Sequence, residues 1–148
     1  VGFITGVDSS AGMIEVLMEK VRQQNLSNVA ARCLDIGRGD DLPGPCDLLV
    51  SAMTLHHIYD IGALLRQFHK ALRPGGHIGL ADLDAEGGRF HEDSHGVFHN
   101  GFDRAEILEK IGKAGFSDIA IATAAEIVKQ DNRNPEERFT VFLATGRK

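Results

Sequence analysis

The sequence predicts an α/β fold in which helices cover both faces of a doubly wound, mostly parallel sheet. Three observations predict it. Short β-rich runs alternate with stretches of helical periodicity. The nearly continuous apolar run Asp47–Met53 is typical of a strand that is buried on both faces. The chain has 148 residues, 43% of them hydrophobic and 25% charged, which fits one domain over residues 1–148.

The first predicted unit is a strand followed by a helix. The β-rich run Phe3–Val7 stops at Asp8, and either Ser9 or Ser10 can then cap a helix that ends near Asn25. Four apolar residues of this helix have the i, i+3, i+4, i+7 spacing of one buried face: Ile14, Leu17, Met18 and Val21.

The middle of the chain repeats this order. A strand is expected at Val29–Leu34, and the polar, glycine-rich stretch Asp35–Pro45 is expected to be a loop. After the apolar run comes a helix, which Pro74-Gly75-Gly76 closes, and then a strand from His77 to Leu83. The apolar residues of that helix are Ile61, Leu64, Leu65, Phe68 and Leu72.

The last third of the chain predicts one helix and two strands. Asp103 and Glu106 form a capping box at the start of the helix. Strands are expected at Ile119–Thr123 and Phe139–Thr145. The stretch Ala124–Arg138 between them has only weak helical patterning, so we expect an antiparallel, hairpin-like return to the sheet.

The charge, the cysteines and the apolar runs of the sequence indicate which partners and which compartment to expect. A formal net charge of -5 offers no cationic surface for a phosphate backbone, so nucleic acid is not expected as a partner. Cys33 and Cys46 form neither a disulfide framework nor a metal knuckle, which favours a reducing compartment. No apolar run approaches the roughly 18 residues of a membrane span. A cytoplasmic protein without a membrane partner is therefore expected.

Two motifs carry a family resemblance. Leu72–Gly76, of sequence Leu-Arg-Pro-Gly-Gly, precedes a strand, and Leu49–His57 ends another strand on a histidine pair. In this order of strands and helices, the chain resembles the class I S-adenosylmethionine-dependent methyltransferases. The resemblance implies S-adenosylmethionine as the cofactor, methyl transfer to a small-molecule acceptor and an antiparallel C-terminal strand in the sheet.

The resemblance also implies cofactor contacts at the ends of the first two strands. Asp8, with Ser9 beside it, stands where the family holds the ribose hydroxyls, and a carboxylate at the carboxyl end of a strand can accept two hydroxyl protons. From spacing alone, Asp8 fits equally well as a cap of the following helix. The resemblance implies that Asp35 and Ile36 contact the adenine, and Asp40 is the alternative to Asp35.

A competing interpretation takes Leu34–Gly39 as the glycine motif that normally follows the first strand of the family. A helix should then come next. Instead, Asp40–Pro45 intervenes, and its prolines block a helix. We therefore interpret this segment as the end of a later strand and not as the cofactor loop.

The end of the third strand is expected to line both the cofactor site and the substrate site. The resemblance places four residues around the sulfonium and adenine: Ser51, Ala52, Met53 and Leu55. His56 and His57 stand where substrate enters, and a histidine can act as general base near neutral pH. The alternative is that either histidine only packs or caps at the strand end.

Acceptor contacts are expected further along the chain. Asp82 and Asp84 stand at the end of the next strand, where they can bind a polar or cationic acceptor or cap the next segment. His99 and Phe102 belong to a segment that resembles an acceptor-side lid, with an apolar lining that also includes Phe90 and Phe98. These phenylalanines can equally bury the loop against the core.

A metal site is not predicted. Three histidines recur at every fourth position, which could bind a metal from one helical face: His91, His95 and His99. The surrounding glycines make a poor helix, so this alternative is not favoured.

The start of the sequence raises two alternatives to an active methyltransferase. No glycine loop precedes Ile4, and the missing strand, loop and helix would need on the order of 30 residues. Such an N-terminally truncated domain would expose an apolar sheet edge and self-associate through it. One alternative is therefore a methyltransferase-like scaffold that has lost cofactor binding. The other is an NAD-type dinucleotide-binding domain, because an acid after a strand also serves NAD ribose.

Overall fold

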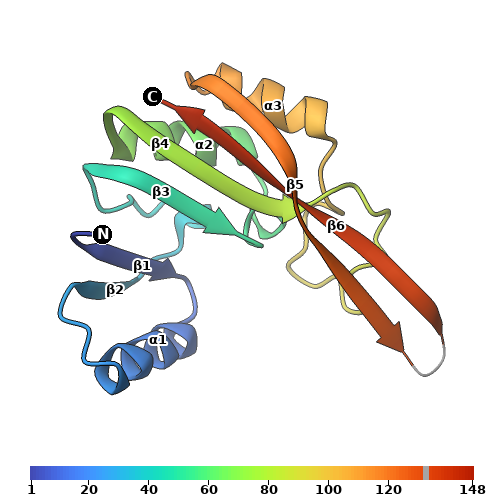
Figure 1. Ribbon diagram of the computed structural model, residues 1–148, viewed down its shortest axis with the longest axis horizontal. Coiled ribbons are helices and arrows are strands. Elements are labelled where there is room, and N and C mark those ends of the chain that lie inside the picture. The colour runs from blue at the N-terminus through green and yellow to red at the C-terminus, as the bar shows by residue number, and fades with distance from the viewer. Residues whose placement is uncertain (132–133) are drawn as a thin grey trace. The chain divides into compact units, whose positions relative to one another are not determined.

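The computed structural model describes residues 1–131 and 134–148. Contacts divide the chain into two units, Val1–Pro43 and Gly44–Lys148. Strands and helices alternate through both units (Figure 1). The order of elements follows the order that the hydrophobic patterns predict.

The first unit is a parallel strand pair joined through a helix. Its elements are β1 (Ile4–Asp8), α1 (Ala11–Gln23) and β2 (Val29–Cys33), followed by one turn of 3₁₀ helix, η1 (Ile36–Arg38). β1 pairs with β2 from Ile4 opposite Val29 to Asp8 opposite Cys33. The predicted apolar face of α1 is confirmed, because Val21 is buried and the other three residues of that face are half-buried.

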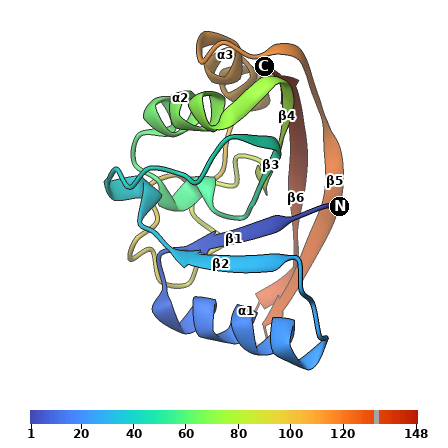
Figure 2. The same ribbon diagram turned by 90° about the vertical axis from the view of Figure 1, so that its left-hand side faces the viewer.

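The second unit holds a sheet of four strands in the order β3-β4-β6-β5. β3 and β4 are parallel, whereas β6 pairs antiparallel with both β4 and β5. Helices α2 and α3 pack side by side against this sheet (Figure 2). The elements are β3 (Cys46–Ala52), η2 (Leu55–His57), α2 (Ile61–Ala71), β4 (Leu72–Leu83), α3 (Arg104–Lys113), β5 (Ser117–Asp131) and β6 (Asn134–Arg147).

The core of the second unit lies between the sheet and the two helices. Leu65 of α2, Leu80 of β4 and Phe142 of β6 have no exposed surface, and neither have Ile107 and Ile111 of α3. The predicted capping role of Asp103 is confirmed, because its carboxylate accepts hydrogen bonds from the backbone of Ala105 and Glu106. No helix in the described ranges is long and apolar enough to span a bilayer.

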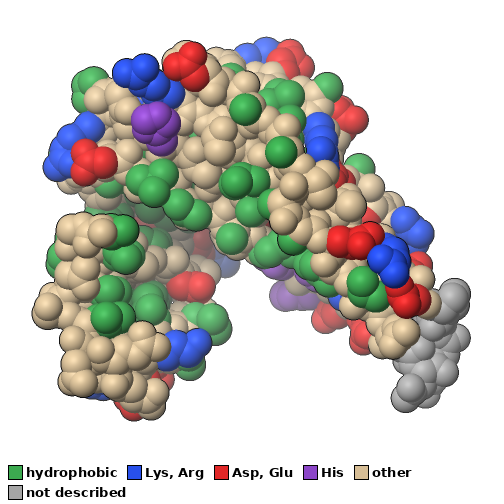
Figure 3. Space-filling view, viewed as in Figure 1, with side chains coloured by type: hydrophobic (Ala, Val, Ile, Leu, Met, Phe, Trp, Pro, Cys, Tyr) green, Lys and Arg blue, Asp and Glu red, His purple; other side chains and the backbone are tan. Residues whose placement is uncertain are grey.

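Strand β3 departs from the prediction that it is buried on both faces. It is an edge strand of the four-stranded sheet, and within the described residues it pairs only with β4. Leu48 is 59% exposed and Val50 67% exposed. Hydrophobic side chains accordingly gather over β3 on the face that Figure 3 shows. The continuous apolar run predicted cover on both faces, but at these two positions the structure leaves one face open.

The two C-terminal strands are longer than predicted. Strands β5 and β6 take up most of the stretch 124–138, which was expected to connect them, and residues 132–133 of that stretch lie outside the described residues. The hairpin projects beyond the rest of the sheet (Figure 1). Near its base, Phe139 and Val141 pack with Leu83 and Phe90 in a small apolar cluster.

A long loop, residues 85–101, leaves β4 and returns to it. Phe102 donates its backbone N–H to Leu83 O at 2.9 Å, and Ala85 donates to Phe102 O at 3.0 Å. The return is possible only because Gly101 has no side chain. A Cβ at Gly101 would lie 2.1 Å from the carbonyl oxygen of Asp84, and its φ of +74° already favours glycine.

Gly101→Ala is therefore expected to destabilise the protein more than an alanine substitution at a glycine that has a positive φ but no close contact. Gly87 is the matched control, because its φ is +70° and no atom lies within 4 Å of a Cβ there. We expect Gly87→Ala to cost about 1–2 kcal/mol of unfolding free energy. Gly101→Ala should cost roughly 1–3 kcal/mol more, from the clash. Equal costs in denaturant titrations would contradict the close contact.

Candidate functional site

The polypeptide turns sharply where β3 ends. Met53 adopts a left-handed conformation with φ of 52° and donates its backbone N–H to Ala81 O of β4 at 2.9 Å. The short helix η2 follows, and its first two residues, Leu55 and His56, are buried. The turn therefore brings the histidine pair against the carboxyl end of β4.

Asp82 of β4 is completely buried and binds His56. The His56 Nδ1 atom lies 2.7 Å from Asp82 Oδ1, and His56 is only 2% exposed. The same carboxylate accepts the backbone N–H groups of Leu55 at 2.9 Å and Leu83 at 2.8 Å. Both oxygens are therefore engaged inside the protein, where Asp82 holds η2 and orients His56. A contact between Asp82 and the acceptor stays a prediction.

His57, in contrast, is exposed. Its Nδ1 lies 2.8 Å from the carbonyl oxygen of Gly96 in the long loop. A carbonyl oxygen can only accept a hydrogen bond, so Nδ1 carries the proton. In the neutral ring, Nε2 then has an unprotonated lone pair. This is the arrangement of a general base that a second group orients.

A third histidine, which the sequence analysis did not assign to this site, joins the pair. The ring centroid of His91 lies 4.9 Å from that of His56 and 5.8 Å from that of His57, and His56 and His57 are 4.1 Å apart. We call these three residues the histidine cluster. Burial lowers the pKa of His91. His56, His57 and Lys129 lower it further, against the opposing effect of Glu86.

The regular spacing of His91, His95 and His99 does not correspond to one helical face, since the segment is a loop. His99 bonds through Nε2 to the carbonyl oxygen of Ile58 at 2.9 Å. Across the described part of the chain, no group of three or more His, Cys, Asp or Glu side chains is placed to hold a metal ion.

The aromatic residues of the long loop divide between core and surface. Phe90 and Phe102 are buried, which agrees with the alternative that they anchor the loop. Phe98 is 55% exposed and packs edge-on against Tyr59, with ring centroids 5.6 Å apart. The backbone N–H groups of Phe98 and His99 both donate to the carbonyl oxygen of His56. The loop is therefore fastened directly to the histidine cluster.

Asp84 also forms its contacts within the protein. Its carboxylate accepts two hydrogen bonds from Arg104, at 2.7 and 2.6 Å, and one from the Thr140 hydroxyl at 2.6 Å. The bonds from Arg104 lower the pKa of Asp84, although burial acts in the opposite direction. Asp84 thus joins the start of α3 to the hairpin, in addition to any acceptor contact.

The predicted cofactor residues of the first unit lie in two turns. Asp8 accepts the backbone N–H of Ser10 at 2.8 Å, and it is Ser10, not the exposed Ser9, that caps α1. Asp35 caps η1, which contains Ile36, by accepting from Arg38 N at 3.1 Å. Asp40 accepts the backbone N–H of Asp35 at 2.8 Å, so both candidates for the adenine contact belong to one turn.

The predicted cofactor residues of the second unit follow one another along the end of β3. Ser51 and Met53 are half-buried and Ala52 is exposed, whereas the side chain of Leu55 lies in the core. Leu55 can therefore act on a ligand only through the backbone that Asp82 holds.

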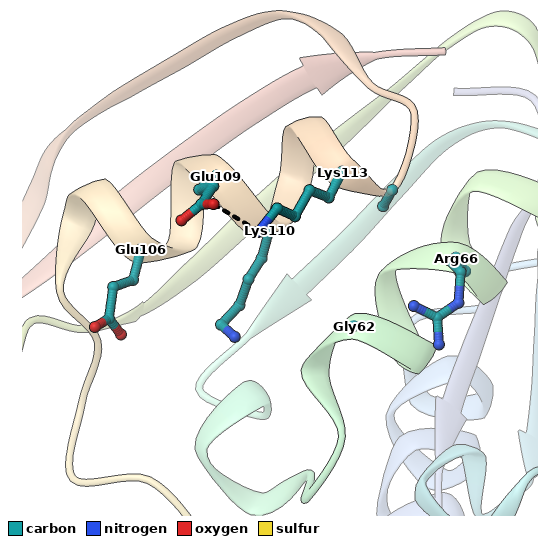
Figure 4. A pocket seen from close by; sticks show the side chains of 7 residues that line it. Gly62, Arg66, Glu106, Glu109, Lys110 and Lys113 are labelled. Atoms are coloured by element: carbon teal, nitrogen blue, oxygen red, sulfur yellow. Dashed lines mark ion pairs between the residues drawn. The ribbon is translucent and has the colours of Figure 1, made fainter.

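A separate polar groove of about 400 Å³ lies between α2 and α3 (Figure 4). Lys113 pairs with Glu109 at 2.6 Å within it. None of its lining residues belongs to the histidine cluster: Gly62, Arg66, Glu106, Glu109, Lys110, Lys113 and Ala114.

Removal of the buried carboxylate should strongly destabilise the second unit. Asp82→Ala leaves buried backbone N–H groups and the His56 ring without their acceptor, and we expect a loss on the order of 3–5 kcal/mol of unfolding free energy. Asp47→Ala is the control, because Asp47 pairs with Arg73 at the surface. It should leave the midpoint of chemical unfolding nearly unchanged. Similar midpoints for the two variants would refute the proposed dependence on Asp82.

The bond from His57 to Gly96 predicts a single tautomer. In long-range ¹H–¹⁵N spectra, recorded well above the ordinary imidazole pKa of about 6.5, neutral His57 should carry its proton on Nδ1. The exposed His95 serves as the internal reference, because no ring contact is seen for it in the described residues. Protonation of His57 mainly on Nε2 would show that Gly96 does not orient it.

Comparison with known proteins identifies the family. A family model described as a methyltransferase domain matches residues 1–76. An uncharacterised methyltransferase of Schizosaccharomyces pombe is 30% identical over 168 aligned residues, which cover 98% of this chain and 59% of that protein. The chain thus spans less than two thirds of this relative's length.

Solved structures share the fold. The YcgJ protein of Bacillus subtilis superimposes with a TM-score of 0.76 at 14% identity, covering 100% of this chain and 83% of that one. Phosphoethanolamine N-methyltransferase 2 of Haemonchus contortus, in complex with S-adenosylmethionine, gives 0.74 at 18% identity, covering 97% and 43%. The predicted α/β fold class is confirmed. Because the family model matches just over half of the chain, the chain belongs to the class I S-adenosylmethionine-dependent methyltransferases.

Proposed function

We propose that this member of the family transfers the methyl group of S-adenosylmethionine to a small-molecule acceptor, with His57 as the general base. The observation that carries the proposal is the exposed His57 ring, whose Nδ1 bonds to Gly96 O at 2.8 Å. The cofactor supplies an activated methyl group on a sulfonium, so the protein mainly has to position the acceptor and take its proton.

The residues in and around the histidine cluster have different proposed roles. His57 Nε2 accepts the proton of an acceptor hydroxyl or amine. His56 and Asp82 are positioning residues, because they are buried and hold η2 in place. His99 and Phe102 act through the long loop, which bonds to the His56 carbonyl oxygen and to β4. Asp84 anchors the loop's return through Arg104.

In the first unit, Asp8 is proposed to hold the ribose hydroxyls, with Ser9 beside it. The chemistry of the residue fits, because a carboxylate accepts two hydrogen bonds, and the Ser10 N–H engages only one of its oxygens, Oδ1. Asp35 and Ile36 are proposed to contact the adenine. Their turn is held by Asp40, which fits a preorganised contact.

In the second unit, the end of β3 is proposed to contribute to cofactor binding through Ser51, Ala52 and Met53. The chain turns left-handed at Met53, where Ala52 is exposed and Ser51 and Met53 are half-buried. Leu55 supports this segment from the core.

The remaining expectations stay predictions. They are a cytoplasmic location, the absence of nucleic-acid binding and self-association through an apolar sheet edge. The exposed Leu48 and Val50 of β3 support the last of these.

Calorimetry on the full-length protein tests the proposal. S-adenosylhomocysteine should bind and NAD should not. Asp8→Asn keeps an acceptor for Ser10 N but loses the charge, so we expect about ten- to hundredfold weaker binding. Glu15→Gln removes an exposed charge from α1 of the same unit and should leave the affinity unchanged. Absence of S-adenosylhomocysteine binding, or binding of NAD in its place, would overturn the proposed function.

A further inference from the structure

The turn after β4 contains a buried carboxylate that is only half satisfied. Glu86 is 6% exposed, and its Oε2 accepts the backbone N–H groups of Arg89 and Phe90, the latter at 2.8 Å. Its other oxygen, Oε1, is buried and has no hydrogen-bond partner in residues 1–131 and 134–148. Native proteins contain few unpaired buried polar atoms, because each of them lowers the stability of the folded state.

A second buried atom in the same turn is also unpaired. His91 Nε2 has no hydrogen-bond partner among the described residues. The Glu86 carboxylate acts on the His91 ring, since it raises the pKa of His91 against the larger effect of burial. Two buried, unpaired polar atoms thus occur within six residues, and one of them belongs to the histidine cluster.

A lysine of the hairpin also contacts this turn. Lys129 of the hairpin donates to Phe90 O, and its ammonium lies 3.9 Å from the centre of the Phe90 ring. Lys129 and Glu86 act on the pKa of His91 in opposite directions. The unpaired Glu86 oxygen needs a hydrogen-bond donor, because a carboxylate oxygen can only accept.

We propose that Glu86 and His91 form a binding site for a proton-donating head group, a hydroxyl or an ammonium, of a small polar molecule. Glu86 Oε1 accepts one of its protons, and His91 Nε2 forms the second hydrogen bond. That this molecule is the methyl acceptor rests on the proposed function, because His57 of the same cluster is the base in that reaction.

Such a site selects its ligand strongly. A pocket built to hydrogen-bond a substrate hydroxyl or amine rejects an analogue without that group, because the buried protein atoms are then left unpaired. Glu86 and His91 would therefore determine which acceptors bind, whereas His57 determines whether the bound acceptor loses its proton.

Three small probes test the site without any cofactor. Ethanolamine, ethylene glycol and tetramethylammonium are added separately to the ¹⁵N-labelled protein. The amide resonances of Arg89 and Phe90 report on the Glu86 carboxylate that they bond. We expect ethanolamine to shift both resonances. A matching effect of ethylene glycol identifies a hydroxyl as sufficient, and its absence identifies the ammonium. Tetramethylammonium, a cation without a donor, should shift neither.

Variants separate recognition from folding. Glu86→Gln and His91→Phe should each weaken the response to ethanolamine by at least about tenfold. His91→Phe leaves the two backbone bonds to Glu86 intact, so it remains informative if Glu86→Gln perturbs the turn. Glu92→Gln, on an exposed position of the same loop, should respond like the unmodified protein.

The proposal is overturned if no probe shifts these resonances, if tetramethylammonium acts as strongly as ethanolamine, or if Glu92→Gln weakens the response as much as His91→Phe. Failure of the proposed function gives a different result. The protein would then bind the donor probes through Glu86 and His91 without binding S-adenosylhomocysteine.

Discussion

The hydrogen bonds of one buried carboxylate hold the second unit's site together. Asp82 ends a strand in the middle of the sheet and binds the backbone of η2 and the ring of His56. The carbonyl oxygen of His56 in turn receives two N–H groups of the long loop. The strand, the short helix and the loop therefore meet at one residue pair. A charge of this kind is costly to bury unless every bond is formed, so the arrangement is specific as well as stable.

This dependence explains why the two neighbouring histidines differ. His56 is buried because its ring contacts the buried carboxylate of Asp82. His57, one residue later in the same 3₁₀ helix, is exposed. Identical side chains at adjacent positions thus have different environments, because one contacts the Asp82 carboxylate and the other contacts a carbonyl oxygen of the long loop. The proposed general base is the histidine that bonds to a carbonyl oxygen of the loop and not to a carboxylate.

Local patterns predicted most of the elements, since α1, α2 and α3 follow apolar spacing and caps that lie within a few residues. The motif that contains Leu55–His57 was also visible in the sequence, although these residues form the 3₁₀ helix η2 and not the end of the strand. The position of His91 was not visible, because His91 lies in a loop without periodicity, far from His56 in the sequence. The exposure of Leu48 and Val50 was missed for a related reason: an apolar run does not reveal whether a neighbouring element covers it.

The length of the hairpin has a consequence for how this protein can vary. Lys129 reaches the loop at Phe90 O from a strand whose pairing places it opposite Glu137. Side chains alternate between the faces of a strand, so a slip of one residue in β5 would turn Lys129 to the other face. Single insertions or deletions in the part of β5 that precedes Lys129 would then break the contact between Lys129 and the loop. Changes beyond Lys129 would spare this contact, which makes the far end of the hairpin the part free to diverge.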